Sequence, residues 1–309
     1  YFSGALGVVM YNTFVGILQA TGDSKHPLYF LIFSSIVNVL LDLLFIVVLG
    51  KGAGAAGLAT AISTVFSAIL CMIELMRRKG AEKLILSQIK FDLPAFKKIL
   101  SNGIPSGMQN SIIGFSNVVV QSGINSVGAE MMSGYGAYTK IEGFAFLPIT
   151  SFAIAITTFI SQNLGAKKGE RAHKGAVFGA VVCCALAEII GVIVFVFARQ
   201  LVGLFDSNPQ VIEYGVAKAH ATVLFYCLLA YSHAMAAVMR GVGRPAVSMV
   251  VMLVCWCFLR VTILETVLQV FQWIPIIYMI HPLTWSFSTI AFTFFFFRVK
   301  WGEGRKEPA

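Results

Sequence analysis

The chain has 309 residues, of which 58% are hydrophobic and only 12% are charged, and its mean hydropathy is +0.82. This composition excludes a soluble enzyme and is typical of a polytopic membrane protein. A net charge of +9 would favour nucleic acid as the partner of a soluble protein, but no nucleic-acid-binding motif accompanies it. In a membrane protein the same charge favours anionic lipid headgroups.

Runs of roughly 20 apolar residues, each long enough to cross a bilayer, recur along the chain. We predict nine membrane-spanning helices, at residues 1–20, 27–49, 54–76, 99–122, 131–161, 174–198, 210–239, 246–267 and 273–297. Pro148 in the fifth run and Pro282 in the ninth each lack a backbone donor. Both therefore predict a kink.

Basic residues gather in every second loop. Of the 23 Lys and Arg residues, 18 lie in one set of loops and in the tail, whereas the alternate loops contain only Lys51 and Arg199. Because basic loops stay in the cytoplasm, we predict a multi-pass protein of the inner (plasma) membrane with a cytoplasmic carboxyl terminus. The amino end at Tyr1 then lies outside, and we expect a fragment whose first spans are missing.

Two polar turns resemble each other. GILQATGDSKHP at 16–27 ends the first predicted span, and AVMRGVGRPAVS at 237–248 ends the seventh, with Gly22 and Gly243 in equivalent places. Weak internal similarity of this kind is typical of transporters built from two repeats. If the second repeat has six spans, three spans of the first repeat lie outside this chain.

The longest polar segment separates three predicted spans from six. Its apolar positions Leu84, Ile85 and Ile89 favour a helix lying in the membrane interface. We therefore divide the chain into the last three spans of an amino-terminal lobe, a cytoplasmic linker with an interfacial helix, a six-span carboxyl-terminal lobe and a cytoplasmic tail, at residues 1–77, 78–97, 98–297 and 298–309.

Asp42 is the most informative residue because it lies inside the apolar run from His26 to Val48. An acid within a membrane helix costs roughly 2.5 to 3.5 kcal/mol on insertion scales, so it usually has a function. Asn38 lies four residues earlier and therefore on the same helix face. We predict an ion or proton site; the alternative is that both side chains pack against another helix through a hydrogen bond.

Other charges within the apolar runs leave more alternatives open. Lys140 and Glu142 are two residues apart, so they project about 200° from each other on a helix. Lys140 is predicted to line a cavity, or to pair with a neighbouring helix. Arg260 is predicted to pair between helices, to contact the cytoplasm or to line a cavity, and Glu188 has no partner that the sequence reveals.

Four motifs resemble the multidrug and toxic compound extrusion (MATE) family. They are GILQATGDSKHP, VNVLLDLLFIVVLGKGAGAAGLATAIS, GIPSGMQ and ISQNLGAKKGERA. Their order resembles spans four to twelve of that family, an all-α membrane bundle of twelve helices in two lobes. The resemblance implies a monomeric secondary antiporter that exports amphipathic or cationic organic compounds in exchange for H⁺ or Na⁺, with membrane lipids around it and no other cofactor.

The resemblance extends to site residues. A DNA-damage-inducible branch of the family binds a cation through an Asn and an Asp in span five, a Thr in span six and acids in span one. Asn38, Asp42 and Thr60 match the first three positions, although without the match Thr60 would be interpreted as a packing residue. Another branch uses acids in spans seven and ten, which this chain lacks, so coupling through the amino-terminal lobe is favoured. The expected substrate cavity would then include polar residues of the other lobe, Lys140, Glu142, Gln109 and Arg260.

Two other functions remain as alternatives. A lipid-linked glycan flippase of the same superfamily would want a larger and more basic cavity. An intramembrane enzyme would need Ser106 as nucleophile and a distant base such as His220, but ordinary packing explains Ser106 better. The six cysteines all lie in apolar runs and are interpreted as small hydrophobic residues, so we expect no metal besides possible Na⁺ at Asp42.

Overall fold

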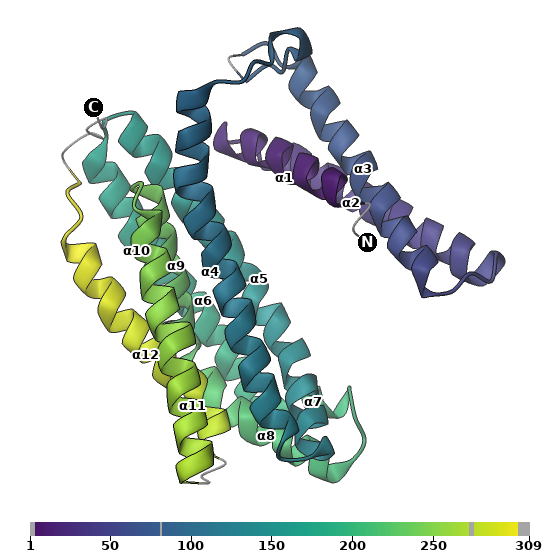
Figure 1. Cartoon of the computed structure of the whole chain (residues 1–309), viewed down its shortest axis with the longest axis vertical. Coiled ribbons are helices and arrows are strands. Elements are labelled where there is room, and N and C mark those ends of the chain that lie inside the picture. Colours follow the sequence, from purple (N-terminus) through teal and green to yellow (C-terminus); the bar gives the residue numbers. More distant parts are fainter. Residues whose placement is uncertain (1–3, 81, 272–274, 302–309) are drawn as a thin grey trace. The chain divides into compact units, whose positions relative to one another are not determined.

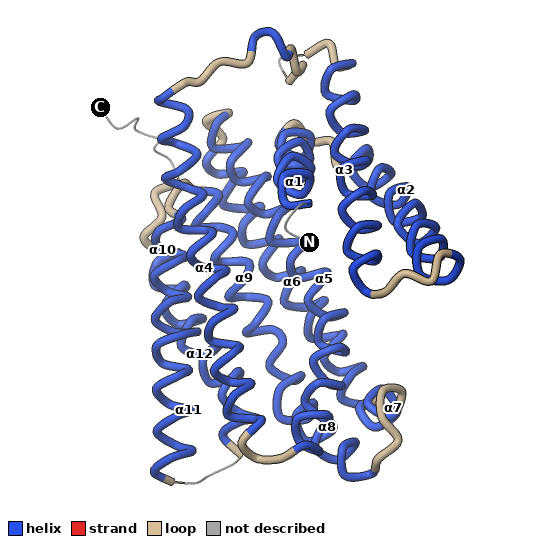
Figure 2. The backbone as a smooth tube through the Cα atoms, turned by 45° about the vertical axis from the view of Figure 1, so that its right-hand side comes forward, coloured by secondary structure: helices blue, strands red, loops and turns tan. Residues whose placement is uncertain are grey.

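The computed structural model describes residues 4–80, 82–271 and 275–301, and the regular structure of these residues is helical throughout (Figures 1 and 2). The chain divides into two compact units, Tyr1–Asp92 and Leu93–Ala309, which we call the amino-terminal unit and the carboxyl-terminal unit. The boundary falls inside the predicted linker.

All nine predicted spans form helices. They are α1 (Ala5–Ala20), α2 (Lys25–Asp42) continued by a π-helix (Leu43–Val48), α3 (Ala53–Arg77), α4 (Leu93–Asn125), α5 (Ala129–Gly165), α6 (Gly169–Val196), α8 (Pro209–Thr222) with α9 (Tyr226–Gly241), α10 (Pro245–Met252) with α11 (Leu259–Val270), and α12 (Ile276–Phe297). A short additional helix, α7 (Ala198–Gly203), follows α6. Seven of the spans in the described residues are long and apolar enough to cross a membrane, and α1 is a shorter apolar helix.

In the amino-terminal unit, α1 and α2 both pack against α3. Gly7 allows α1 to approach α3 closely, because a Cβ atom at this position would lie only 2.6 Å from the Val65 side chain. The Ser34 hydroxyl of α2 donates to the carbonyl of Ser63 on α3 at 2.6 Å. Small residues and interhelical hydroxyl bonds hold membrane helices together where the lipid supplies no hydrophobic driving force.

The two similar turns share one backbone geometry. Gly22 and Gly243 have φ of +89° and +80°, a left-handed conformation that glycine adopts without strain. The amide after each glycine donates to the carbonyl five residues earlier, at 2.9 Å in the first turn and 2.8 Å in the second. This is the Schellman ending of a helix. The predicted equivalence of the two turns is confirmed.

The linker departs from the prediction. In place of an interfacial helix it contains one 3-10 turn, Leu86–Gln88, and α4 begins at Leu93. The Leu84 side chain packs on the Leu75 cluster, and its amide donates to the Leu75 carbonyl at 3.1 Å. Leu84 is thus taken from the predicted apolar stripe by α3, whereas Ile85 and Ile89 stay exposed.

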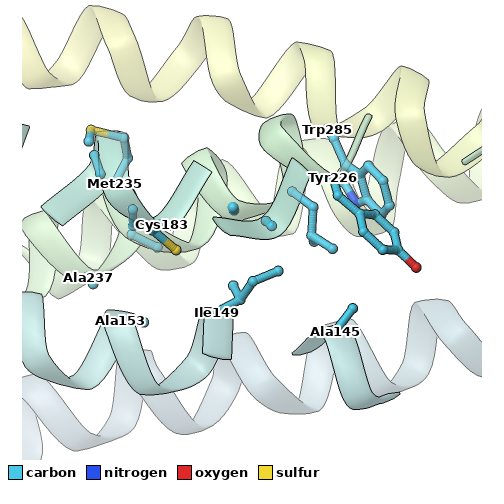
Figure 3. Packing of buried hydrophobic residues seen from close by; sticks show 14 of the residues in the cluster. Ala145, Ile149, Ala153, Cys183, Tyr226, Met235, Ala237 and Trp285 are labelled. Atoms are coloured by element: carbon cyan, nitrogen blue, oxygen red, sulfur yellow. The ribbon is translucent and has the colours of Figure 1, made fainter. Parts of the chain in front are cut away.

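In the carboxyl-terminal unit, α5 packs against α6, α8 and α9. Of its small and branched core residues, Ala153 lies close to Ala237 of α9, and Ala145 lies on the side of Tyr226 and Trp285 (Figure 3). Within this unit, the α5–α6 and α9–α10 turns lie at the upper end in Figure 1, and α7 lies at the lower end. The basic turns of this unit therefore share one end, as alternating spans require.

Both prolines predicted to cause kinks lie inside helices, Pro148 in α5 and Pro282 in α12. Proline has no N–H to donate to the carbonyl four residues earlier, which for Pro282 is that of Tyr278. The Lys218 ammonium and the Thr222 hydroxyl donate to this carbonyl instead, at 3.1 and 3.4 Å. A buried lysine of α8 thus compensates for the interruption in α12.

Candidate functional site

Asp42 ends α2 and directly precedes the π-helix Leu43–Val48. Short π segments within helices often mark functional sites. The Asn38 Nδ2 and the Asp42 Oδ1 are both buried and have no hydrogen-bond partner among the described residues. A buried polar atom without a partner costs about 1 to 3 kcal/mol, and more when it is charged. The Asp42 Oδ1 therefore has unused capacity to accept a proton or contact a cation, whereas the Asn38 Nδ2 can only donate, so Asn38 would offer a cation its amide oxygen.

Thr60, the third predicted member of this site, lies on α3. Its side chain is exposed and its hydroxyl donates to the Ala56 carbonyl of the same helix at 3.0 Å. The structure thus places Asn38 and Asp42 one turn apart on one helix but shows no hydrogen bond from Thr60 to either. Carboxylate, amide and hydroxyl oxygens are hard ligands that suit Na⁺. A proton would need the Asp42 carboxylate alone.

A second polar cluster joins the α1–α2 turn to the end of α3. Asp23 bonds to the His26 ring at 2.6 Å and to the Arg78 guanidinium, and Arg78 also bonds to Glu74 at 2.9 Å. Burial would raise the pKa of Asp23, but the bonds from the His26 amide and from Arg78 outweigh it and lower this pKa to about 2. Asp23, His26 and Glu74 are spaced closely enough for a metal, yet both carboxylates already bond to Arg78.

A buried charge cluster lies in the carboxyl-terminal unit. Lys218 is only 1% exposed, and its ammonium bonds to the carbonyls of Ile277 and Tyr278 at 3.4 and 3.1 Å and to the His281 Nδ1 at 3.1 Å. Its three donors are thus all used. Sequence reasoning missed Lys218 as a site residue, although a lysine within an apolar run was the same signal that identified Lys140.

Glu142 and Lys140 leave α5 in different directions, as their spacing predicts. The Tyr138 hydroxyl donates to the Glu142 carboxylate at 3.1 Å, and Glu142 interacts electrostatically with Lys218 and Arg260. The Lys140 side chain is exposed, with its Nζ 5.1 Å from the centre of the Phe205 ring. The structure therefore places Glu142 in the charge cluster and Lys140 outside it.

Arg260 belongs to the cluster, and Gln109 lies apart from it. The Arg260 guanidinium is 1% exposed, donates to Asn117 and Thr284 at 3.3 Å each, and has no partner at Nε. Gln109 is buried and accepts a bond from the Ser248 hydroxyl at 2.8 Å, which ties α4 to α10. Of the four predicted cavity residues, the structure brings together Glu142 and Arg260.

Glu188 has a partner that the sequence did not reveal. Its carboxylate accepts a hydrogen bond from the backbone amide of Cys227 at 3.0 Å. That amide lies just after the 3-10 turn Val223–Phe225, which separates α8 from α9. Because a break in a membrane helix leaves backbone groups to be satisfied by neighbours, Glu188 stabilises this break.

The two residues of the enzyme alternative are occupied by backbone bonds. The Ser106 hydroxyl donates to the Asn102 carbonyl at 2.9 Å, and the His220 Nε2 lies 3.1 Å from the Phe195 carbonyl oxygen. A nucleophile and its base would need to bond to each other. The hydroxyl and the ring instead each satisfy a helix carbonyl.

Comparisons with known proteins agree with this architecture. The MatE family model matches residues 105–265, more than half of the chain. The chain is 28% identical over 259 residues to a probable multidrug resistance protein, YpnP, of Bacillus subtilis, and 26% identical over 243 residues to a second one, YoeA, of the same organism. These alignments cover 84% and 76% of the chain but only 58% and 52% of the relatives, so the chain spans a little over half of their length.

A crystal structure titled as MATE in complex with MaL6 superposes with a TM-score of 0.87 at 18% sequence identity. The superposition covers 96% of this chain and 66% of the other one. At this level of identity the likeness establishes the fold, and the all-α membrane bundle predicted from the sequence is confirmed.

Proposed function

Because the chain belongs to the MATE family, we propose that it works within a secondary antiporter that exports amphipathic or cationic organic compounds in exchange for H⁺ or Na⁺. It is a multi-pass membrane protein with helices long and apolar enough to span a bilayer. We place it in the plasma membrane with the carboxyl terminus in the cytoplasm, since 18 of its 23 basic residues lie in loops of one side.

The observation that carries this proposal is the buried Oδ1 of Asp42, which has no hydrogen-bond partner among the described residues. A carboxylate at this depth needs a neutralising partner, and a proton or Na⁺ supplies one. Asp42 lies 17 residues beyond Lys25, the first residue of α2, or roughly 25 Å along the helix at 1.5 Å per residue. If α2 starts at the cytoplasmic side, the site is reached from outside, where the coupling ion is supplied.

Binding of the ion can drive export only if the ion favours one arrangement of the transporter over the other. In this proposal the filled Asp42 site favours the arrangement that releases the compound outside, and the empty site favours the inward-facing one. The polar residues of the carboxyl-terminal unit then contact the compound. The ion and the compound thus occupy different units.

The test is gradient-driven efflux in proteoliposomes of the full-length protein. Asp42→Asn should abolish the dependence of efflux on the H⁺ or Na⁺ gradient while leaving membrane abundance and equilibrium binding of the compound largely intact. Asn38→Ala and Thr60→Ala should be milder, and more damaging for Na⁺ than for H⁺. Glu213→Gln, which removes an exposed acid of α8, is the matched control. Wild-type coupling in Asp42→Asn would show that the coupling site lies elsewhere.

A further inference from the structure

Arg260 is a buried cation without a counterion. Its guanidinium is 1% exposed, and both of its hydrogen bonds, each 3.3 Å long, go to the uncharged side chains of Asn117 and Thr284. It forms no ion pair with any carboxylate among the described residues, and its Nε has no acceptor. Since a buried charge is costly unless it is paired and hydrogen-bonded, this site is incomplete.

The surrounding charges do not remove this deficit. Lys218 adds a second buried positive charge, and Glu142 is the carboxylate that interacts with both cations. With all three side chains ionised, one positive charge remains in excess. The donors of Lys218 are occupied by two carbonyls and His281. The unused donor capacity of the cluster therefore belongs to Arg260.

Two more buried donors without an acceptor lie on the helices that carry the partners of Arg260. Among the described residues, neither the Ser116 hydroxyl of α4 nor the Trp285 indole N–H of α12 has a partner. Successive residues of a helix project about 100° apart, so these two donors need not face Arg260. The unused donor at the Arg260 site itself is its Nε, and a guanidinium N–H can only donate.

We propose that Arg260 binds a carboxylate or phosphate group of the exported compound, so that this transporter favours zwitterionic or anionic amphipathic compounds over purely cationic ones of the same shape. The proposal rests on the proposed export function. A guanidinium fork matches the two oxygens of such a group. Because Arg260 is closed off in this arrangement, the contact forms in the arrangement in which α4, α11 and α12 open to the compound. Glu142 carries the opposite charge and competes with the compound.

The test compares two ligands that differ only at the anionic group, a zwitterionic fluoroquinolone and its methyl ester. Equilibrium binding is measured with the full-length protein in nanodiscs. The wild type should bind the free acid about 10-fold more tightly than the ester, as expected for one buried charge pair. Arg260→Gln should bring this ratio close to one, and Arg260→Lys, which keeps the charge but loses the fork, should give an intermediate ratio.

Glu142→Gln should change the acid-to-ester binding preference in the opposite direction to Arg260→Gln. Removing the competing carboxylate should raise the acid-to-ester preference about threefold or more. If the cluster has only a structural role, Arg260→Gln and Glu142→Gln should each lower the binding affinity for the acid and the ester by the same factor. That result would overturn the proposal. Thermal unfolding of each variant shows whether it is folded. If Arg260→Gln is not folded, the acid-to-ester ratios of Arg260→Lys and Glu142→Gln test the proposal.

Two further outcomes would also contradict the proposal. One is equal binding of acid and ester by the wild type. The other is loss of the preference when chloride replaces gluconate in the buffer, which would identify the site as one for small inorganic anions. Export of the zwitterionic fluoroquinolone from proteoliposomes that contain the same full-length protein tests the proposed function separately. If the fluoroquinolone is not exported while the acid preference holds, the export function fails and the anion site stands.

Discussion

The two units bury polar side chains in opposite ways. In the amino-terminal unit, Asp42 and Asn38 stand alone in an apolar helix with atoms that no side chain satisfies. In the carboxyl-terminal unit, Glu142 interacts electrostatically with Lys218 and Arg260, so two cationic side chains share one carboxylate. A lone buried carboxylate attracts a cation, whereas a cluster with excess positive charge repels one. This difference is why we propose the coupling ion for the first unit and the anionic part of the compound for the second.

The largest loss of stability is expected on substitution of Lys218, because its ammonium bonds to buried groups of the carboxyl-terminal unit. Lys218→Met leaves the Tyr278 carbonyl at the Pro282 interruption without its main donor and the Glu142 carboxylate with one cation fewer. Leaving a buried carbonyl without its donor costs roughly 1 to 3 kcal/mol. We expect a strong fall in thermal stability and in membrane abundance. Adding Glu142→Gln should restore part of it, and full stability of Lys218→Met alone would show that the cluster carries no such coupling.

A smaller loss of stability is expected on substitution of Asp23. Asp23 lies in the same unit as Asp42, but its carboxylate has hydrogen-bond partners, so the two acids can be compared directly. Asp23→Asn loses charged bonds to Arg78 and His26 and should lower stability by about 1 to 2 kcal/mol at pH 7. The folded pKa of Asp23, about 2, lies below its usual value near 4. The stabilisation is therefore complete above about pH 4 and is lost as the pH falls towards 2.

Thermal unfolding of wild type and Asp23→Asn between pH 2 and 7 measures this difference. The gap between the two unfolding temperatures should close in the acid range. A gap that stays constant down to pH 2 would contradict the assignment, since it would mean that the carboxylate charge is not what stabilises the turn. Asp42→Asn, in contrast, should be at least as stable as the wild type at pH 7, because it removes a charge that lacks a partner.

The smallest effect on stability is expected at Lys140. It lies on the same helix as Glu142, yet its side chain is exposed and its ammonium lies over the Phe205 ring. An exposed cation–π contact contributes roughly 0.5 to 1 kcal/mol. Lys140→Ala should therefore insert normally and change the relative resistance to different compounds. If resistance to all compounds fell in proportion to protein abundance, Lys140 would have a folding role and no contact with the compound.

The sequence predicted the helices well and the polar contacts poorly, for physical reasons. Nine apolar runs of bilayer length and two glycine turns depend on local composition, and all of them recur in the structure. The role of Lys218 depends on a carbonyl released by Pro282, which lies 64 positions away in the sequence. Contacts of this kind require the packing of α8 against α12, which no local pattern encodes.

Two other positions illustrate the same limit. Glu188 acquired a partner because the span formed by α8 and α9 breaks at Val223–Phe225, and the sequence there shows neither proline nor glycine. The linker was predicted as an interfacial helix because its apolar spacing fits one, but Leu84 packs back onto α3. The pairing of Asn38 with Asp42 on one face, by contrast, followed from helical spacing alone.

The most direct measurement of the central claim counts the cations that the compound displaces. Purified full-length protein in nanodiscs, in weakly buffered solution, is mixed with a saturating concentration of the zwitterionic fluoroquinolone while proton release is followed with a pH dye and Na⁺ release with ²²Na⁺. We predict release of about one cation per protein from the wild type and from Glu142→Gln, and none from Asp42→Asn. Undiminished release from Asp42→Asn would contradict the assignment of the coupling ion to the amino-terminal unit.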